Sequence, residues 1–238
     1  MSDTVKISWS GGKDSTAATL LHLEAGHICK IVNFVPMLTQ DIPLIRKDHY
    51  DFIRKAASRF ESAGGVVYQA IGMTYWDHVH RIKVRGKYKG RPYGAGLGLG
   101  FCGFRDRVKI YAIDHVVVGP YDYQDIGIAS DEIRRHGQLT EDKRSILVEH
   151  GITEQQALAM CEEAGLLSPI YRSTGRDGCA ICPNAKREVF LQWLNDWPGA
   201  YEILMEIEEY CKSLGGEHER FTPYRHYMWW SDRIAGRC

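Results

Sequence analysis

The fold is decided by one stretch near the start of the chain: Val5-Lys6-Ile7-Ser8-Trp9-Ser10-Gly11-Gly12-Lys13-Asp14-Ser15. Its apolar first half is typical of a buried strand, and the two glycines end that strand. Ala18, Leu21 and Ala25 then recur at helical spacing, which predicts a helix directly after the glycines. A strand, a glycine turn and a helix N-terminus together form an anion site, because the helix dipole and the first N–H groups both favour negative charge there.

The residue pattern of this glycine loop excludes two common nucleotide-binding motifs. It lacks both the G-x-x-x-x-G-K-[ST] pattern of a Walker A loop and the G-x-G-x-x-G pattern of dinucleotide-binding folds. Ser10 and Ser15 add hydroxyl donors and Lys13 adds a positive charge, so an oxyanion is the expected ligand. The alternative is a plain glycine turn that carries two serines, and the strand-to-helix context argues against it.

The composition of the chain limits its partners. Its 238 residues include 30 Lys and Arg against 30 Asp and Glu, so any anion binding must come from local clusters of charge. There is no apolar run of the ~18 residues that a membrane span needs, and no signal-peptide pattern. We therefore expect a cytoplasmic protein with no membrane partner. In that compartment seven cysteines favour a metal, a cluster or redox chemistry over a disulfide framework.

Strands alternate with helices in the first half of the chain. Residues 28–35, 66–71 and 115–119 are predicted to be strands, and residues 49–60 are predicted to be a helix with one apolar face. This alternation predicts an α/β fold, with a doubly wound, mainly parallel sheet and a helical C-terminal extension. The ligand should then lie beyond the carboxyl ends of the strands, where the glycine loop is expected.

The expected domain boundary lies near residue 150. Residues 1–150 are predicted to form a nucleotide-binding domain with a basic, glycine-rich insertion at about 81–103. Residues 151–238 are predicted to be a helical region that carries the C-x-x-C segment. Thr153 and Gln156 have the spacing of a capping box, which predicts a helix start at that point. The aromatic and basic tail over residues 221–238 is either a packed extension or a segment that orders on binding.

The insertion carries a cation at every second position. These residues are Arg81, Lys83, Arg85, Lys87, Lys89 and Arg91. In an extended conformation all six would project to one side, as a clamp on an anionic substrate such as a nucleic-acid backbone. The alternative is a solvated hairpin face, because charge runs commonly have no further role.

The cysteines suggest a metal site. Cys179 and Cys182 form a C-x-x-C segment before a predicted helix, and Cys102 lies in a glycine-rich loop suited to holding a ligand. Cys161 is a possible further ligand, although its apolar helical face favours a packing role. Three thiolates suit a [4Fe–4S] cluster with one open iron, or Zn²⁺ with a borrowed histidine. A redox dithiol is the third option.

Three blocks of sequence now resemble one family. They are residues 10–15, residues 102–109, and a third block that runs from 127–135 through 150–154 to 178–183. Over roughly residues 5–195 the chain resembles the phosphoadenosine phosphosulfate (PAPS) reductase-like branch of the ATP pyrophosphatases, the PP-loop proteins. The resemblance implies an adenine nucleotide alpha hydrolase-like fold and an enzyme that uses ATP.

The resemblance also implies roles for individual residues. The phosphate-holding positions are Ser10, Gly11, Gly12, Lys13, Asp14 and Ser15. The main chain near Asn33 would lie against adenine, and the segment with Asp131, Glu132, Arg134 and Arg135 would lie over the nucleotide. Lys13, Arg134 and Arg135 would stabilise developing phosphate charge, and Asp14 or Asp131 would help to bind Mg²⁺. Cys102, Cys179 and Cys182 match cluster-ligand positions.

Two departures from the family pattern direct the choice of reaction. Gly103 follows Cys102, where the cluster-bearing reductases carry adjacent cysteines. The Glu-Cys-Gly-x-His segment that holds the reductase nucleophile matches only residues 215–218, which contain no cysteine. The leading expectation is therefore an enzyme that adenylates a substrate with ATP and Mg²⁺, for sulfur transfer with an iron–sulfur cluster.

Two other functions stay open from the sequence. One is an adenylylsulfate or phosphoadenylylsulfate reductase, for which Cys238 would have to be the nucleophile. The other is a non-catalytic nucleotide-binding subunit, whose aromatic tail would contact a partner. A homodimer is also open.

Overall fold

The computed structural model describes residues 2–98, 101–137, 139–173, 178–214 and 229–237. The chain forms two compact units, each assembled from three stretches. Unit 1 consists of Met1–Phe34, Asp48–Ile71 and Ile113–Asp177. Unit 2 consists of Val35–Lys47, Gly72–Ala112 and Gly178–Cys238. This division differs from the predicted boundary at residue 150, because the chain passes between the units several times.

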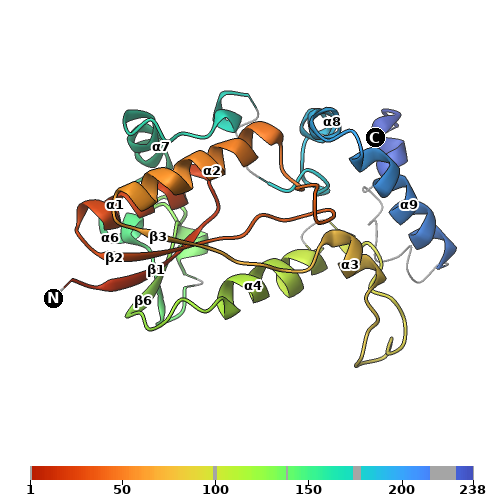
Figure 1. Cartoon of the computed structure of the whole chain (residues 1–238), viewed down its shortest axis with the longest axis horizontal. Helices are drawn as coiled ribbons and strands as arrows, with labels where there is room; N and C mark the ends of the chain where they lie inside the picture. Colours follow the sequence, from red (N-terminus) through yellow and green to blue (C-terminus); the bar gives the residue numbers. More distant parts are fainter. Residues whose placement is uncertain (1, 99–100, 138, 174–177, 215–228, 238) are drawn as a thin grey trace. The chain divides into compact units, whose positions relative to one another are not determined.

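Unit 1 contains a five-stranded sheet in which every strand pair is parallel (Figure 1). Its strands, in spatial order, are β3 (Val66–Gln69), β2 (Ile28–Asn33), β1 (Thr4–Trp9), β6 (Tyr123–Ile126) and β7 (Lys143–Arg144). The chain winds outward from β1 to β2 and β3, and then returns to the other side of β1. The doubly wound α/β fold is therefore confirmed.

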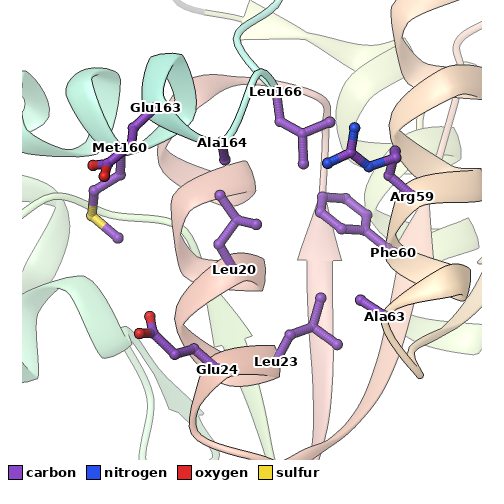
Figure 2. A pocket seen from close by; sticks show the side chains of 10 residues that line it. All are labelled: Leu20, Leu23, Glu24, Arg59, Phe60, Ala63, Met160, Glu163, Ala164 and Leu166. Carbon is purple, nitrogen blue, oxygen red and sulfur yellow. The ribbon is translucent and has the colours of Figure 1, made fainter.

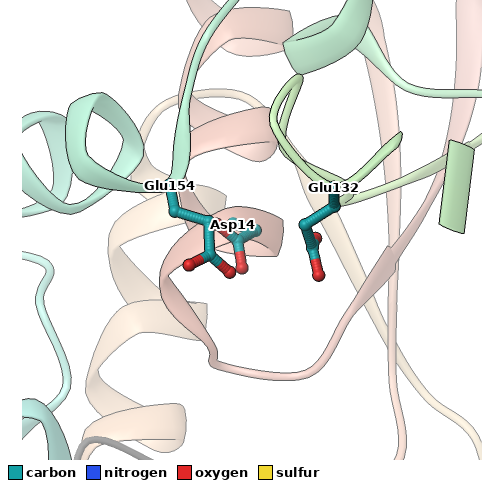
Figure 3. A group of neighbouring side chains, drawn as sticks. All are labelled: Asp14, Glu132 and Glu154. Atoms are coloured by element: carbon teal, nitrogen blue, oxygen red, sulfur yellow. The ribbon is translucent and has the colours of Figure 1, made fainter. Parts of the chain in front are cut away.

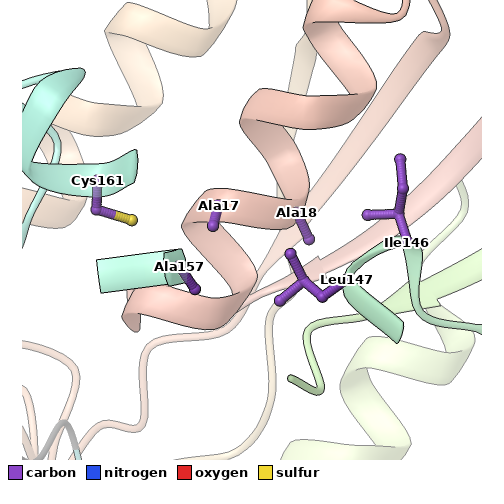
Figure 4. Close-up of a cluster of buried hydrophobic side chains, with 6 residues drawn as sticks. All are labelled: Ala17, Ala18, Ile146, Leu147, Ala157 and Cys161. Carbon is purple, nitrogen blue, oxygen red and sulfur yellow. The ribbon is translucent and has the colours of Figure 1, made fainter. Parts of the chain in front are cut away.

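Unit 1 contains six helical segments in the part of the chain that the structure describes. They are α1 (Lys13–Glu24), α2 (Lys47–Ser62), α5 (Ile133–His136), α6 (Ile146–Glu149), α7 (Glu154–Glu163) and the 3₁₀ turn Pro169–Arg172. Of these, α1 packs against α6 and α7. Ala17 and Ala18 of α1 face Leu147 of α6 and Ala157 of α7 in one buried cluster (Figure 4). Alanines let the helix axes approach closely, and this fixes where α7 begins relative to the glycine loop.

The predicted strand at 115–119 is wrong. The helix α4 (Ile110–His115) ends there, and Val117 is 88% exposed. The strand next to β1 is instead β6, whose Gln124 and Asp125 are buried. Gln124 Nε2 donates to Ser8 Oγ at 2.7 Å, and Asp125 Oδ2 accepts from the Ile146 N–H at 2.8 Å. These hydrogen bonds give partners to Gln124 Nε2 and Asp125 Oδ2, polar atoms that a periodicity argument places outside the core, while Asp125 Oδ1 has no hydrogen-bond partner among the described residues.

Unit 2 is mainly helical. Its described elements are α3 (Tyr75–His80), the strand pair β4 (Leu97–Gly98) and β5 (Phe101–Cys102), the π-helix Arg105–Lys109, α8 (Arg187–Asp196), α9 (Ala200–Ser213) and α11 (Trp230–Ile234). Tyr75 is fully buried and makes edge-on ring contacts with Phe104 and Trp230. Trp193 Nε1 donates to the Pro43 carbonyl at 2.7 Å. The segment 215–218 and most of the predicted tail lie outside the described residues.

No helix within the described ranges is long and apolar enough to cross a membrane.

Candidate functional site

The glycine loop lies at the point where the winding of the sheet changes direction. It follows β1, and Gly127 follows β6, which is paired in parallel with β1 on the side away from β2. In doubly wound sheets the ligand crevice opens at this switch point, beyond the carboxyl ends of the strands. The loop therefore occupies the position that the sequence predicts for a ligand site.

Hydrogen bonds within the loop hold its two serines in place. Ser15 Oγ accepts from the Ser10 N–H at 3.2 Å and donates to the Gly12 carbonyl at 3.1 Å. The Gly12 N–H donates to Ser10 Oγ at 3.3 Å, and the two hydroxyl oxygens lie 3.2 Å apart. Among the described residues no side chain makes a cap hydrogen bond with Gly12, although the next N–H, that of Lys13, donates to Tyr171. The loop is thus preformed around the first turn of a helix, which is the geometry of an oxyanion site.

Two glycines in this region cannot be replaced without a shift of their neighbours. Gly11 has a φ of +83°, and a Cβ there would lie 2.8 Å from Ile53 Cγ1 and 2.9 Å from His49 Cε1. A Cβ on Gly127 would lie 2.5 Å from the Ser15 backbone nitrogen. The end of β6 therefore packs directly on the first turn of α1, with room only for a glycine.

Three carboxylates meet beside the loop. The ligand oxygens of Asp14, Glu132 and Glu154 all lie within 4.8 Å of one another, and Figure 3 shows them facing the same space. They come from α1, from the residue before α5 and from the first turn of α7. Among the described residues this is the one group of three or more acidic, histidine or cysteine side chains with such close ligand atoms.

Lys13 provides the positive charge that balances this acidic trio. Its Nζ lies 2.8 Å from Asp14 Oδ1 and 3.3 Å from Glu154 Oε1. Burial raises the pKa of Asp14, and the charges of Glu154 and Glu132 raise it further, although Lys13 opposes the shift. The pKa of Lys13 is also raised, because its hydrogen bond and attraction to Asp14, helped by Glu154, outweigh the effect of burial. Lys13 thus pairs with two of the three carboxylates, and the guanidinium of Arg135 pairs with the third, Glu132.

Asp131, which the resemblance offered with Asp14 as an Mg²⁺ ligand, contacts the start of α7 in the structure. Its carboxylate is exposed and accepts from the Glu154 N–H at 3.0 Å. It therefore holds the start of α7, while Glu132 and Glu154 lie with Asp14 at the candidate cation position. Arg135 pairs with Glu132 at 2.7 Å, and Arg134 is exposed.

Asn33 lies at the carboxyl end of β2, in register with Trp9. Its amide Nδ2 donates to the Trp9 carbonyl at 2.9 Å, while its main-chain carbonyl accepts from the Ala70 N–H. The side-chain Oδ1 is buried and has no hydrogen-bond partner among the described residues. A buried acceptor without a partner is costly, and a ligand amine would satisfy it.

Four residues near the loop were not predicted from the sequence to be site residues. Tyr171 accepts the Lys13 N–H at 2.9 Å, and His49 Nδ1 lies 2.8 Å from Ser168 Oγ while its ring packs against Gly11. Glu154 and Gly127 are the other two. Only Gly127 carried a local signal, as a glycine before an acidic segment. The others reach the loop through packing of distant segments, which one sequence does not reveal.

The cysteines fall into two groups. Cys102, Cys179 and Cys182 all lie in unit 2. The pKa of the Cys179 thiol is raised, mainly by burial and to a smaller extent by the charges of Cys182 and Cys102. The pKa of Cys102 is raised by burial and by Cys182, against a 3.2 Å hydrogen bond from the Arg105 N–H. The three thiols therefore lie near one another. They do not all approach within 4.8 Å, so a single zinc ion would require them to move closer.

Cys161 belongs to the core of unit 1. It is fully buried, donates to the Lys13 carbonyl at 3.2 Å and belongs to the apolar cluster of Figure 4. Burial raises its pKa to about 12, followed by a smaller effect of Asp14. We assign Cys161 a packing role and not the ligand role considered from the sequence.

A groove of about 610 Å³ lies elsewhere in unit 1 (Figure 2). Leu20, Leu23 and Glu24 of α1 line it, with side chains from α2 and α7. These residues belong to the C-terminal half of α1, whereas the glycine loop precedes its first turn. The groove is therefore separate from the loop.

The sequence matches no protein-family model, and a search of curated proteins finds no similar sequence.

Proposed function

We propose that the chain is an ATP-using enzyme of the PP-loop type that adenylates its substrate. The observation that carries this proposal is the pairing of a preformed oxyanion loop with three carboxylates at the switch point of the sheet. The glycine loop attracts an anion, whereas the three carboxylates repel one. A divalent cation held by the carboxylates would let both groups bind the same ligand. Nucleoside triphosphate with Mg²⁺ is a ligand that satisfies both.

The residues present fit Mg²⁺, because the ion prefers oxygen ligands and keeps several waters. Asp14, Glu132 and Glu154 would hold the ion. The ammonium of Lys13 already pairs with Asp14 and Glu154, which indicates that this position attracts a cation. When bound, Mg²⁺ neutralises phosphate charge and polarises the phosphorus. The carboxylates would then face the cation, and Lys13 could exchange its contact with Asp14 for a phosphate oxygen.

The remaining roles follow from position. The loop N–H groups and the hydroxyls of Ser10 and Ser15 would hold the phosphates. The buried Asn33 Oδ1 would accept a hydrogen bond from the adenine amine. A carbonyl oxygen of the substrate would attack the α-phosphorus and displace pyrophosphate, whose charge Lys13, Arg134 and Arg135 would stabilise.

Sulfur transfer is the finer part of the proposal. The neighbouring thiols of Cys102, Cys179 and Cys182 support it, since three thiolates would hold a cluster with each sulfur on a different iron. A structural Zn²⁺ is the alternative. Sulfonucleotide reduction needs a nucleophilic thiol, and its candidate, Cys238, lies outside the described residues.

The test is calorimetric binding of ATP with and without Mg²⁺, together with pyrophosphate release. We expect Mg²⁺ to strengthen binding at least about tenfold, equivalent to about 1.4 kcal/mol, and Glu132→Gln with Glu154→Gln to remove that gain. Glu162→Gln, an exposed acid on the same helix, is the matched control. Equal ATP binding in the presence of a chelator would contradict the cation role of the trio.

A further inference from the structure

The basic insertion forms a hairpin in unit 2 (Figure 1). An antiparallel bridge joins Ile82 to Pro92, and the Lys83 N–H donates to the Arg91 carbonyl at 2.8 Å. The chain turns between Gly86 and Gly90, both of which have positive φ. Because of this turn the six cations do not lie along one extended strand, which was the condition for their projecting to one side.

The hairpin and the π-helix enclose a pocket of about 260 Å³ that no carboxylate lines. Its charged lining residues are Lys83, Arg85 and Lys87 of the hairpin and Arg107 of the π-helix. Within the described ranges, Arg85, Lys87 and Arg107 form no ion pair with a carboxylate. Four cations thus converge on a small space in a chain with no net charge.

Two tyrosine rings contact three of these cations. The Arg107 guanidinium lies 4.9 Å from the Tyr93 ring centroid, and Lys83 Nζ lies 5.6 Å from it. Lys87 Nζ lies 5.5 Å from the Tyr88 ring. Cation–π contacts of this kind fix a cation over a ring face while its charge stays available to an anion.

A buried imidazole at the pocket supplies the second, independent observation. His78 of α3 lines the pocket, is 1% exposed and packs against Tyr93 at 5.3 Å between ring centroids. Neither of its ring nitrogens has a hydrogen-bond partner among the described residues. Burial lowers the pKa of His78 to about 4, followed by repulsion from Arg107 and Arg81, so the ring is neutral and carries one N–H donor.

We propose that this pocket binds a phosphate ester. Its oxygens would accept from the His78 N–H and pair with the guanidinium of Arg107 and the hairpin lysines, so that one ligand satisfies both the unpaired imidazole and the converging charge. The volume fits a single phosphate with part of its sugar and is below the ~300–1,000 Å³ of sites that enclose a whole small molecule. The ester could belong to a nucleic-acid backbone or to a free nucleotide.

The first arm of the test measures binding of the full chain to a fluorescein-labelled single-stranded RNA by fluorescence anisotropy. Arg85→Gln and Arg107→Gln should each weaken binding several-fold and lower the slope of log K against log salt by about 1. Arg54→Gln and Lys55→Gln, exposed cations on α2 of unit 1, are the matched controls and should leave both quantities unchanged.

The second arm follows the ring resonances of His78 by NMR while inorganic phosphate and then AMP are added. A saturable shift that Arg107→Gln abolishes supports the phosphate pocket. If this shift appears while RNA binding is insensitive to the hairpin, the ester comes from a free nucleotide. Changes in both arms assign a backbone phosphate. Unchanged RNA binding in the hairpin variants together with an unmoved His78 overturns the proposal.

The proposal is independent of the ATP site. Gly11→Ala should disrupt the glycine loop and leave the response of His78 to phosphate intact. The hairpin variants should leave Mg²⁺-dependent ATP binding intact. Failure of one site is therefore distinguishable from failure of the other.

Discussion

At the scale of single residues, the candidate ATP site depends on close approaches that leave no room for a methyl group. Gly127 lets the end of β6 meet the backbone of Asp14 and Ser15, and Gly11 turns the chain beneath His49 and Ile53. Neither contact is a hydrogen bond, so neither glycine would be found in a list of polar site residues. Both nevertheless fix where the loop N–H groups point.

Gly127→Ala should lower both stability and ATP affinity. The new Cβ would lie 2.5 Å from the Ser15 nitrogen, so α1 must shift, and overpacking of this kind costs typically ~1–3 kcal/mol. Urea unfolding and ATP calorimetry measure the two effects. Gly137→Ala is the matched control, because Gly137 has a φ of −64° and its added Cβ meets nothing closer than 3.9 Å. Wild-type behaviour of Gly127→Ala would show that the loop tolerates the displacement.

The acidic trio predicts the direction of a pH effect. A carboxylate binds Mg²⁺ only above its pKa, and burial together with Glu154 and Glu132 raises the pKa of Asp14. The gain in ATP affinity from Mg²⁺ should therefore decline as the pH falls, beginning at a higher pH than for an ordinary aspartate. Calorimetry at a series of pH values measures this, and Asp14→Asn should remove the part of the decline that Asp14 causes. An Mg²⁺ gain that is constant down to the usual range of aspartate would contradict the assignment.

At the scale of elements, α7 is the helix that completes the site. Its first residue, Glu154, reaches the trio because the capping box of Thr153 and Gln156 sets the start of the helix, and Asp131 holds the same end. The sequence predicts this capping box, and the structure confirms it. What the sequence could not show is that α7 packs on α1 through Ala157 and Cys161, which brings Glu154 to Asp14.

Thr153→Ala should therefore affect stability and ligand binding together. Loss of an N-cap typically costs ~1 kcal/mol, and the loosened first turn should weaken Mg²⁺-dependent ATP binding. Thr74→Ala is the control, since Thr74 caps α3 of unit 2 with the same kind of box. We expect a similar loss of stability there without an effect on ATP. If the two variants weakened ATP binding equally, the loss of stability alone would explain the weaker binding.

The strands show the physical limit of prediction from the sequence. β1 and β2 could be predicted because most of their buried residues are apolar, although Lys6 and Asn33 are buried too. β6 could not, since its buried residues Gln124 and Asp125 are polar and find their partners on Ser8, Ile146 and His22. Residues 115–119 were predicted to be a strand because they are mainly apolar, although Val117 is in fact exposed. Patterns of hydrophobicity report burial, and hydrogen bonds made by distant residues remain invisible to them.

At the scale of the whole molecule, the two kinds of candidate site belong to different units. The glycine loop and acidic trio lie in unit 1, and the three thiols and the hairpin pocket lie in unit 2. The iron or zinc content can therefore be tested by replacing cysteines of unit 2, with a cysteine of unit 1 as the control. Protein purified without oxygen should contain iron and sulfide that Cys179→Ala removes, while Cys161→Ala in unit 1 retains them. Zinc at one ion per chain would make the thiols structural, and absence of any metal would contradict their ligand role.

A fragment of residues 1–150 should fail to fold, although the sequence suggested it as a domain. It lacks α7, so Ala17 and Ala18 of α1 would lose the cover of Ala157 and Cys161. Circular dichroism and the dispersion of amide NMR signals would detect the loss. The matched control is the full chain, and a cooperatively unfolding fragment would contradict this reading of the unit boundaries.

The interleaving of the units also governs how the protein can be made. β1 is the central strand of its sheet and is synthesised first, yet its neighbour β6 begins only at Tyr123. Until that residue leaves the ribosome, one edge of β1 remains open while segments of unit 2 are also emerging. A nascent chain in this state exposes an unpaired strand edge, so its yield in cells should depend on chaperones and on the rate of translation.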